Sequence, residues 1–317
     1  MTQCGRFREN GRGLTVERLD VGIVDRFPGA DEVDIDGAEI RPVCFLGLAP
    51  RCPVYRHNPT ATVRQSGAVR ARVVDWVFTF PFLAAFGAVL LVFDPLQRLA
   101  RLFGQRPQEI VAGGLQVGLV QAIRVCGTRF QIERSPHVQP RTPYLFVANH
   151  QSMFDIPIFG AVLFTNFPKY VSKRELARWI PSISYNLRRG GNALIDRGDR
   201  AQATRAIQEL GRRCQERGVS AVIYPEGTRA RRGELGGFRP AGSLALMEAA
   251  PRIPVVPVTI DKSWQLLRHN LLPVPFGTRI RFRIGDPIER HDAEDLSAVL
   301  AEVHHEIGKT LASWRGN

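Results

Sequence analysis

The chain has 317 residues, enough for one large domain or two small ones. Hydrophobic residues make up 44% of it and charged residues 23%, which excludes a wholly disordered chain, a collagen-like chain and a disulfide scaffold. The formal net charge of +13 indicates an anionic partner, such as a phosphorylated substrate or an anionic lipid surface.

The distribution of this charge narrows the choice of partner. Residues 111–250 carry 20 basic and 10 acidic side chains, so the excess lies in the middle of the chain rather than in a basic tail. No zinc-finger spacing or aromatic RNA-binding signature accompanies it, and nucleic acid is therefore not an expected partner. Five scattered cysteines without a C-x-x-C pair argue against a zinc site or a disulfide framework and fit a reducing compartment.

Residues 1–70 mix Gly, Pro, Arg and acidic residues without a sustained helical or strand period. They predict a poorly ordered N-terminal extension with short strands near 19–24 and 40–46. No apolar segment typical of a signal peptide follows Met1, so a cleaved signal peptide is not expected.

Residues 71–126 are expected to anchor the protein to a membrane. Residues 76–93 carry no charge, which is near the lower length limit for a membrane span, although Pro81 and Gly87 interrupt the stretch. A shorter apolar stretch, 110–123, contains glutamines and predicts an interfacial helix, so that the pair could form a hairpin within one leaflet. The alternative for the first stretch is a buried core helix.

Residues 127–317 alternate between strand and helix patterns, which predicts an α/β fold with a central mixed or largely parallel sheet flanked by helices. Strands are expected at 144–148, 169–171, 193–195, 220–224, 253–260 and 279–284. Helices are expected at 152–164, 200–216, after Pro240 and at 293–314, with a helical turn at 175–180.

The segment N-H-Q-S-M-F-D at 149–155 directly follows an apolar strand, the place where open α/β sheets usually bind ligands. His150 and Asp155 would face apart on a continuous helix, but across a strand-to-helix bend Asp155 can hold one imidazole nitrogen. This is the base and orienter of a hydrolytic triad without its serine, so the nucleophile can be a hydroxyl of the substrate. The alternative is that His150 caps the helix and Asp155 is a solvated first-turn carboxylate.

A second polar segment, Y-P-E-G-T-R at 224–229, also follows an apolar strand. Arg229 is suited to bind a phosphate through two parallel N–H bonds. Glu226 could accept a hydrogen bond from a hydroxyl or fix that arginine, and Gly227 lets the backbone approach a ligand closely. The alternative is a surface hairpin with solvated charges.

These segments together resemble the lysophosphatidate (1-acylglycerol-3-phosphate) acyltransferase family of membrane glycerolipid acyltransferases. The family's N-H-x-x-x-x-D and E-G-T-R blocks are matched by Asn149, His150 and Asp155, and by Glu226, Gly227, Thr228 and Arg229. An intervening block is matched by Lys173, Glu175 and Leu176, followed by G-N-A-L-I-D-R at 191–197. A fourth block is matched by the proline-containing strand at 253–258. Four blocks in the family's order over residues 140–260 make the match specific.

The resemblance implies an enzyme that moves a fatty acyl group from acyl-CoA or acyl-carrier protein to the sn-2 hydroxyl of 1-acyl-sn-glycerol 3-phosphate. The product would be phosphatidate, in phospholipid biosynthesis, and no metal or other cofactor is implied. His150 would be the general base and Asp155 its orienter. The acceptor phosphate would be bound by Arg229, with Glu226, Gly227, Thr228, Lys173 and Arg197 in the same pocket.

The expected organisation is therefore an N-terminal extension at 1–70, a membrane-anchoring helical segment at 71–126 and an acyltransferase catalytic domain at 127–317. The expected partners are the acyl donor, a lysophospholipid and a membrane surface, with the catalytic domain facing the cytoplasm. Two alternatives stay open. The acceptor could be another lysolipid, such as a lyso-ornithine lipid, or glycerol 3-phosphate, or the protein could be a catalytically idle membrane-binding module.

Overall fold

A computed structural model describes residues 8–10, 13–15, 71–290 and 295–316. The chain divides into two compact units, Met1–Gly67 and Ala68–Asn317. In the first unit a short antiparallel pair joins β1 (Arg8–Asn10) to β2 (Gly13–Thr15). The strands expected near 19–24 and 40–46, and the rest of the predicted extension, lie outside the described residues.

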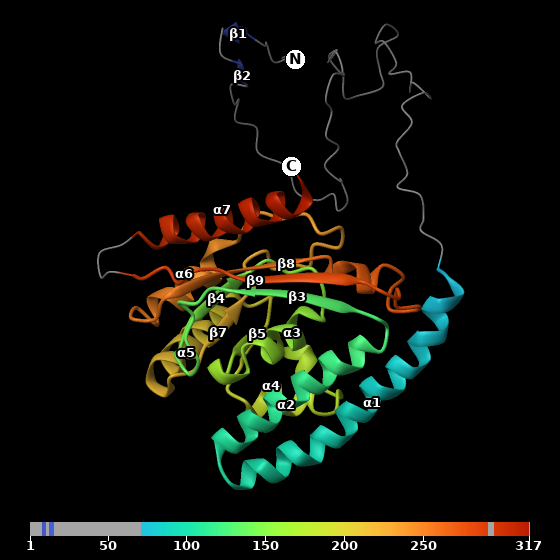
Figure 1. Cartoon of the computed structure of the whole chain (residues 1–317). Coiled ribbons are helices and arrows are strands. Elements are labelled where there is room, and N and C mark those ends of the chain that lie inside the picture. The colour runs from blue at the N-terminus through green and yellow to red at the C-terminus, as the bar shows by residue number, and fades with distance from the viewer. Residues whose placement is uncertain (1–7, 11–12, 16–70, 291–294, 317) are drawn as a thin grey trace, which may run out of the picture. The chain divides into compact units, whose positions relative to one another are not determined.

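A mostly parallel sheet of seven strands forms the centre of the second unit (Figure 1). Its order is β3-β9-β8-β4-β7-β5-β6, and within the described chain β8 and β9 form its antiparallel pair. This confirms the predicted α/β class with a mixed, largely parallel sheet. The strands are β3 (Arg129–Arg134), β4 (Leu145–Ala148), β5 (Lys169–Lys173), β6 (Ala193–Ile195), β7 (Ala221–Ile223), β8 (Val255–Asp261) and β9 (Arg279–Ile284).

Burial follows from the sequence of each strand. The central strands β4, β7 and β8 are buried at every position, which explains their nearly continuous apolar sequences. In β9 the side chains of Ile280, Phe282 and Ile284 are buried, whereas the arginines between them point outward. The edge strand β3 was missed by sequence analysis because it is mostly exposed and only Phe130 and Ile132 in it are apolar.

Helices cover both faces of this sheet (Figure 1). One hydrophobic cluster packs α1, α2 and α3 against one face, and a second packs α5, α6 and α7 against the other. The helices are α1 (Val73–Leu102), α2 (Gln105–Arg124), α3 (Asp155–Val162), α4 (Ile183–Arg189), α5 (Arg200–Arg217), α6 (Pro240–Glu248) and α7 (Leu296–Arg315). Three short 3₁₀ helices are η1 (Phe164–Asn166), η2 (Arg174–Ala177) and η3 (Ser263–Leu267).

Helix α1 continues through Pro81 and Gly87, so the expected interruption of the apolar stretch is absent from this helix. One side of α1 packs inward through Thr79, Phe82 and Gln97. The other side carries large exposed apolar residues along the whole helix: Val73, Trp76, Val77, Phe80, Leu83, Leu91, Val92, Leu96, Leu99 and Leu102. By length and composition alone, α1 could cross a membrane.

Half of the residues of helix α2 are buried within the protein between α1 and α3 (Figure 1), and an interfacial position of its other side stays a prediction. It also carries a buried carboxylate, Glu109. The Oε1 atom of Glu109 lies 2.9 Å from Lys169 Nζ of β5 and 3.2 Å from Arg217 Nη1 of α5. Since Lys169 is itself buried, this ion pair ties α2 to the sheet.

Candidate active site

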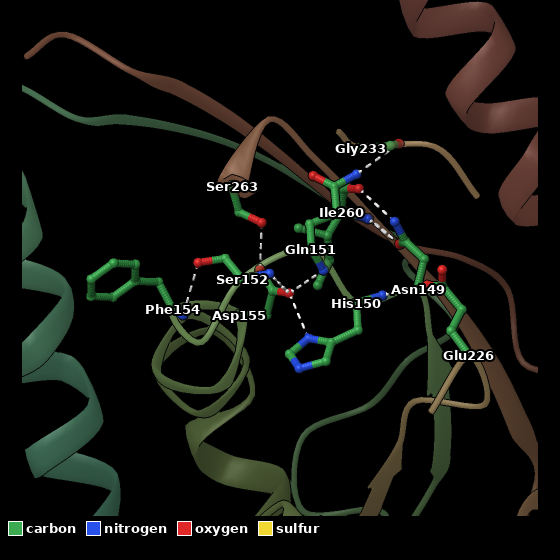
Figure 2. Close-up of polar contacts among 10 residues, drawn as sticks. All are labelled: Asn149, His150, Gln151, Ser152, Phe154, Asp155, Glu226, Gly233, Ile260 and Ser263. Atoms are coloured by element: carbon green, nitrogen blue, oxygen red, sulfur yellow. Dashed lines mark hydrogen bonds and ion pairs between the residues drawn. The ribbon is translucent and has the colours of Figure 1, made fainter. Parts of the chain in front are cut away.

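The loop between β4 and α3 bends so that His150 and Asp155 face each other (Figure 2). His150 Nδ1 lies 2.8 Å from Asp155 Oδ2. A carboxylate can only accept, so Nδ1 carries a hydrogen, and in the neutral imidazole Nε2, which faces away from Asp155, is the acceptor. The His150 side chain is 16% exposed, whereas Asp155 is fully buried. Asp155 is therefore not the solvated carboxylate of the alternative interpretation.

Four donors hold the Asp155 carboxylate. Besides the imidazole, Oδ2 accepts the backbone N–H groups of Gln151 at 2.7 Å and Ser152 at 2.8 Å. Oδ1 accepts the hydroxyl of Ser263, at 2.5 Å. Because the Asp155 side chain takes these loop N–H groups, α3 begins at Asp155, three residues later than expected. The carboxylate is thus locked in place before any substrate binds.

Ser263 is a site residue that sequence analysis missed. It follows β8 at the start of η3 and is 108 residues from Asp155 in the chain. Its hydroxyl is fully buried against the carboxylate that orients His150. A single serine after a buried strand carries no distinguishing pattern, so its role becomes visible only when β4 and β8 are paired in the sheet.

Replacing Ser263 by Ala is expected to lower kcat about tenfold and to change KM little, because a charged acceptor loses one hydrogen bond and Asp155 gains freedom to move. Steady-state kinetics measure the effect. Ser243→Ala is the matched control, since Ser243 is equally buried but its hydroxyl has no hydrogen-bond partner among the described residues. Equal losses in the two variants would contradict the positioning role of Ser263.

Glu226 connects the two polar loops. Its Oε1 accepts the His150 backbone N–H at 2.7 Å, and its Oε2 accepts the Gly236 N–H at 3.0 Å. The Ala230 N–H in turn donates to the His150 carbonyl at 2.8 Å. Glu226 is 6% exposed, and its described partners are these backbone groups rather than Arg229. In the described structure Glu226 therefore fixes the His150 loop rather than Arg229, and the expected contact of Glu226 with a ligand stays a prediction.

Burial raises the pKa of Glu226 above its ordinary value of 4.5, although two backbone N–H groups donate to it. Above pH 4.5 the folded state consequently holds this proton more tightly than the unfolded state, and stability decreases as the pH rises through that window. We expect Glu226→Gln, which cannot titrate, to lack this decrease. Urea unfolding in detergent at several pH values measures it.

The control for this titration is Glu234→Gln, which removes an exposed carboxylate from the same loop. The difference in unfolding free energy between Glu234→Gln and the wild-type protein should be constant across the same pH range. If the difference in unfolding free energy between the wild-type protein and Glu226→Gln were also independent of pH, the raised pKa of Glu226 would be contradicted.

Tyr224 packs on the face of the His150 imidazole. The two ring centroids lie 4.2 Å apart and the planes are inclined by 22°. Burial raises the pKa of the Tyr224 hydroxyl well above its ordinary value, so this group stays protonated. The imidazole is therefore held in its plane by Asp155 and on one face by Tyr224.

The sheet topology gathers the predicted cationic residues along one edge. His150 and Arg229 follow the adjacent strands β4 and β7, Lys173 ends β5, and Arg197 lies two residues beyond β6. Neighbouring strands are about 4.8 Å apart, which puts β5 about 10 Å and β6 about 14 Å from β4. Arg197 is therefore farther from His150 than Arg229 is.

Arg229 and its neighbours are open to a ligand. Arg229, Lys173 and Arg197 are exposed, and none of their side chains makes a hydrogen bond or ion pair with the described parts of the chain. Thr228 is exposed as well. Gly227 adopts φ +69°, a conformation that favours glycine, and turns the chain so that this loop lies against His150. The site thus combines a base with unpaired cations.

Comparisons with known proteins agree with this arrangement. A family model described as acyltransferase matches residues 129–261. The 1-acyl-sn-glycerol-3-phosphate acyltransferase alpha of Mus musculus is 32% identical over 195 residues, which cover 61% of this chain and 67% of that protein. The corresponding proteins of Escherichia coli and Limnanthes douglasii are 23% and 28% identical, and 76% and 66% of their lengths are covered.

A solved structure supports the fold. The crystal structure of the 1-acyl-sn-glycerophosphate (LPA) acyltransferase from Thermotoga maritima superposes with a TM-score of 0.59 at 21% identity. The match covers 77% of this chain and 97% of that one. The chain is thus an enzyme of the acyltransferase class, and it belongs to the 1-acylglycerol-3-phosphate acyltransferase family of glycerolipid acyltransferases. The resemblance seen in the motifs is confirmed.

Proposed function

We propose that the protein transfers a fatty acyl group from a thioester to the sn-2 hydroxyl of 1-acyl-sn-glycerol 3-phosphate, giving phosphatidate. The observation that carries this proposal is the His150–Asp155 pair with a free Nε2, directly beside a loop that presents the unpaired Arg229. The names of the mouse, Escherichia coli and Limnanthes relatives support the choice of acceptor.

The chemistry follows from the free nitrogen. His150 Nε2 takes the proton from the acceptor hydroxyl as its oxygen attacks the thioester carbonyl carbon and forms the new C–O bond. The Asp155 carboxylate stabilises the imidazolium that results. When the tetrahedral intermediate collapses, the C–S bond breaks and the leaving thiolate takes the proton from Nε2. The histidine is then restored for the next cycle.

Arg229 supplies the charge that recognises the acceptor. Its planar guanidinium can donate two parallel hydrogen bonds to a phosphate monoester. Lys173 and Arg197 add positive charge along the same edge, and Thr228 can donate a further hydrogen bond. The Glu226 carboxylate, which accepts the backbone N–H groups of His150 and Gly236, holds the base in place relative to this loop.

We infer from α1 how the enzyme meets its lipid substrate. Thirty residues of helix measure about 45 Å, and the inward side of α1 packs on the protein while the outward side is apolar. A helix that crossed the bilayer would be surrounded by lipid. We therefore propose that α1 lies within one leaflet, with the catalytic part at the cytoplasmic surface.

The decisive experiment incubates the purified full chain with labelled acyl-CoA or acyl-carrier protein and a panel of acceptors in vesicles. We expect phosphatidate from lysophosphatidate at the highest kcat/KM. Faster product formation from a lyso-ornithine lipid or from glycerol 3-phosphate would overturn the acceptor. No product from any pair would favour the catalytically idle module. The two donors, compared at equal concentration, identify the carrier.

A further inference from the structure

The loop between β5 and α4, residues 174–182, exposes a large aromatic side chain to solvent. Trp179 is 96% exposed, and Leu176 in the same loop is 42% exposed. Trp179 adopts φ +68°, a backbone conformation that bulky residues rarely take. The fold thus keeps this tryptophan pointing outward although its backbone is strained there, which indicates that a partner covers it.

This loop is fastened to the outer helix α1. The Ser182 N–H donates to Asp94 Oδ1 at 2.7 Å, and the Ser182 hydroxyl donates to the Leu90 carbonyl at 2.7 Å. Gln97 Nε2 of α1 donates to the Ser182 carbonyl at 3.2 Å. These contacts lie on the half of α1 whose outer side exposes Leu91 and Leu96. The loop is therefore fixed beside the same half of α1 that exposes Leu91 and Leu96.

The charge around Trp179 identifies the partner's chemistry. Lys173, Arg174 and Arg178 are exposed beside a single exposed carboxylate, Glu175. A tryptophan among cations is the composition found at the headgroup level of membranes. There the amphipathic indole lies between water and hydrocarbon, and basic side chains pair with anionic lipid.

We propose that residues 173–182 form a second membrane contact, which seats Trp179 and Leu176 at the headgroup level of an anionic bilayer beside α1. This inference rests on the proposed function, because it assumes a lipid substrate. Lys173 belongs both to this loop and to the carboxyl edge of the sheet. The contact consequently fixes the height of the site at the depth where a lysolipid presents its phosphate and its free hydroxyl.

Tryptophan fluorescence tests the contact directly. The full chain is bound to vesicles whose acyl chains carry bromine near the headgroup, which quenches indoles at that depth. Of the four tryptophans, Trp76 on α1 and Trp179 are the exposed ones. We expect Trp179→Phe to lose a large part of the quenching. The control Trp264→Phe, which removes a half-buried indole on η3, should lose little.

Lipid dependence gives a second measurement. Arg178→Gln is expected to weaken binding to vesicles containing anionic lipid about fivefold and to leave binding to neutral vesicles unchanged. Trp179→Ala is expected to raise KM for lysophosphatidate held in vesicles about three- to tenfold. The KM for a short-chain lysophosphatidate, dissolved as monomers, should not change, because that substrate does not arrive from the bilayer.

The outcomes separate this inference from the proposed function. If Trp179→Phe is quenched like the wild-type protein while acyl transfer proceeds, the second contact is refuted and the enzyme assignment stands. If indole shielding depends on protein concentration rather than on lipid, Trp179 contacts a second copy of the chain and the lipid proposal is overturned. Absence of acyl transfer with the monomeric substrate refutes the proposed function whatever the fluorescence shows.

Discussion

Replacing His150 by Ala is expected to lower kcat for acyl transfer by about 10²–10⁴-fold, because the substrate hydroxyl then has no base to take its proton. The fold and the binding to vesicles should be retained, because the Asp155 carboxylate keeps its donors from Gln151, Ser152 and Ser263. Thin-layer analysis of labelled phosphatidate measures the rate, and circular dichroism measures the fold.

The chain offers a matched control for this variant. His137 Nδ1 lies 3.1 Å from Asp286 Oδ1, so the same two residue types are paired elsewhere. Both of those side chains are more than two-thirds exposed, whereas Asp155 is fully buried. His137→Ala should leave kcat unchanged. Near-normal turnover by His150→Ala would overturn the mechanism.

Asp155→Asn should be nearly as damaging as loss of the histidine. The neutral amide cannot stabilise the imidazolium, and its NH₂ group would face donors at Gln151, Ser152 or Ser263. Because the two side chains act as a unit, the double variant should be little worse than His150→Ala alone. Additive losses would show that Asp155 acts through the fold rather than through the base.

Arg229→Ala is the second substitution with a large expected effect. We expect it to lower kcat/KM for lysophosphatidate by ten- to a hundredfold, about 1.5–3 kcal/mol, mainly through KM. The reason is that an exposed guanidinium without a partner in the described chain is free to make charge-assisted hydrogen bonds to a phosphate. Arg229→Lys should recover part of this loss, because an ammonium cannot form the paired hydrogen bonds.

Two controls test whether the effect of Arg229→Ala is specific to this arginine and to the phosphate of the acceptor. Arg231→Ala removes another exposed arginine from the same loop and tests whether general charge is sufficient. A lysolipid without a phosphate monoester tests whether the loss is specific to the acceptor. If kcat/KM falls equally for both acceptors, Arg229 holds the loop or binds the thioester, and the lysophosphatidate proposal loses its main support.

Local sequence patterns predicted much of the fold. The strand at 193–195 and the helix beginning at Arg200 are found where they were expected, because apolar runs and caps act over a few residues. Helix α4 and strand β3 were missed, since α4 is short and β3 is an exposed edge. The burial of α2 depends on α1 and α3, which no local pattern specifies.

The candidate site likewise has features that neighbouring residues predict and contacts that they do not. The bend that brings His150 to Asp155 follows from adjacent residues, and the unpaired cations follow from their motifs. The contacts of Ser263 and Glu226 with the base loop join segments that are far apart in the chain. They depend on the order of β4, β7 and β8 in the sheet, which the sequence pattern does not specify.

The buried pair of Glu109 and Lys169 bears on how a water-soluble version of this enzyme can be made. Cutting away the helical pair would remove the carboxylate that pairs with Lys169 and would also uncover the apolar face of α3 and the sheet on which α1 and α2 pack. An exposed apolar face of this size favours association between molecules. Truncation should therefore yield aggregates, whereas polar substitutions at Leu91, Leu99 and other outward positions of α1 should keep the interior intact.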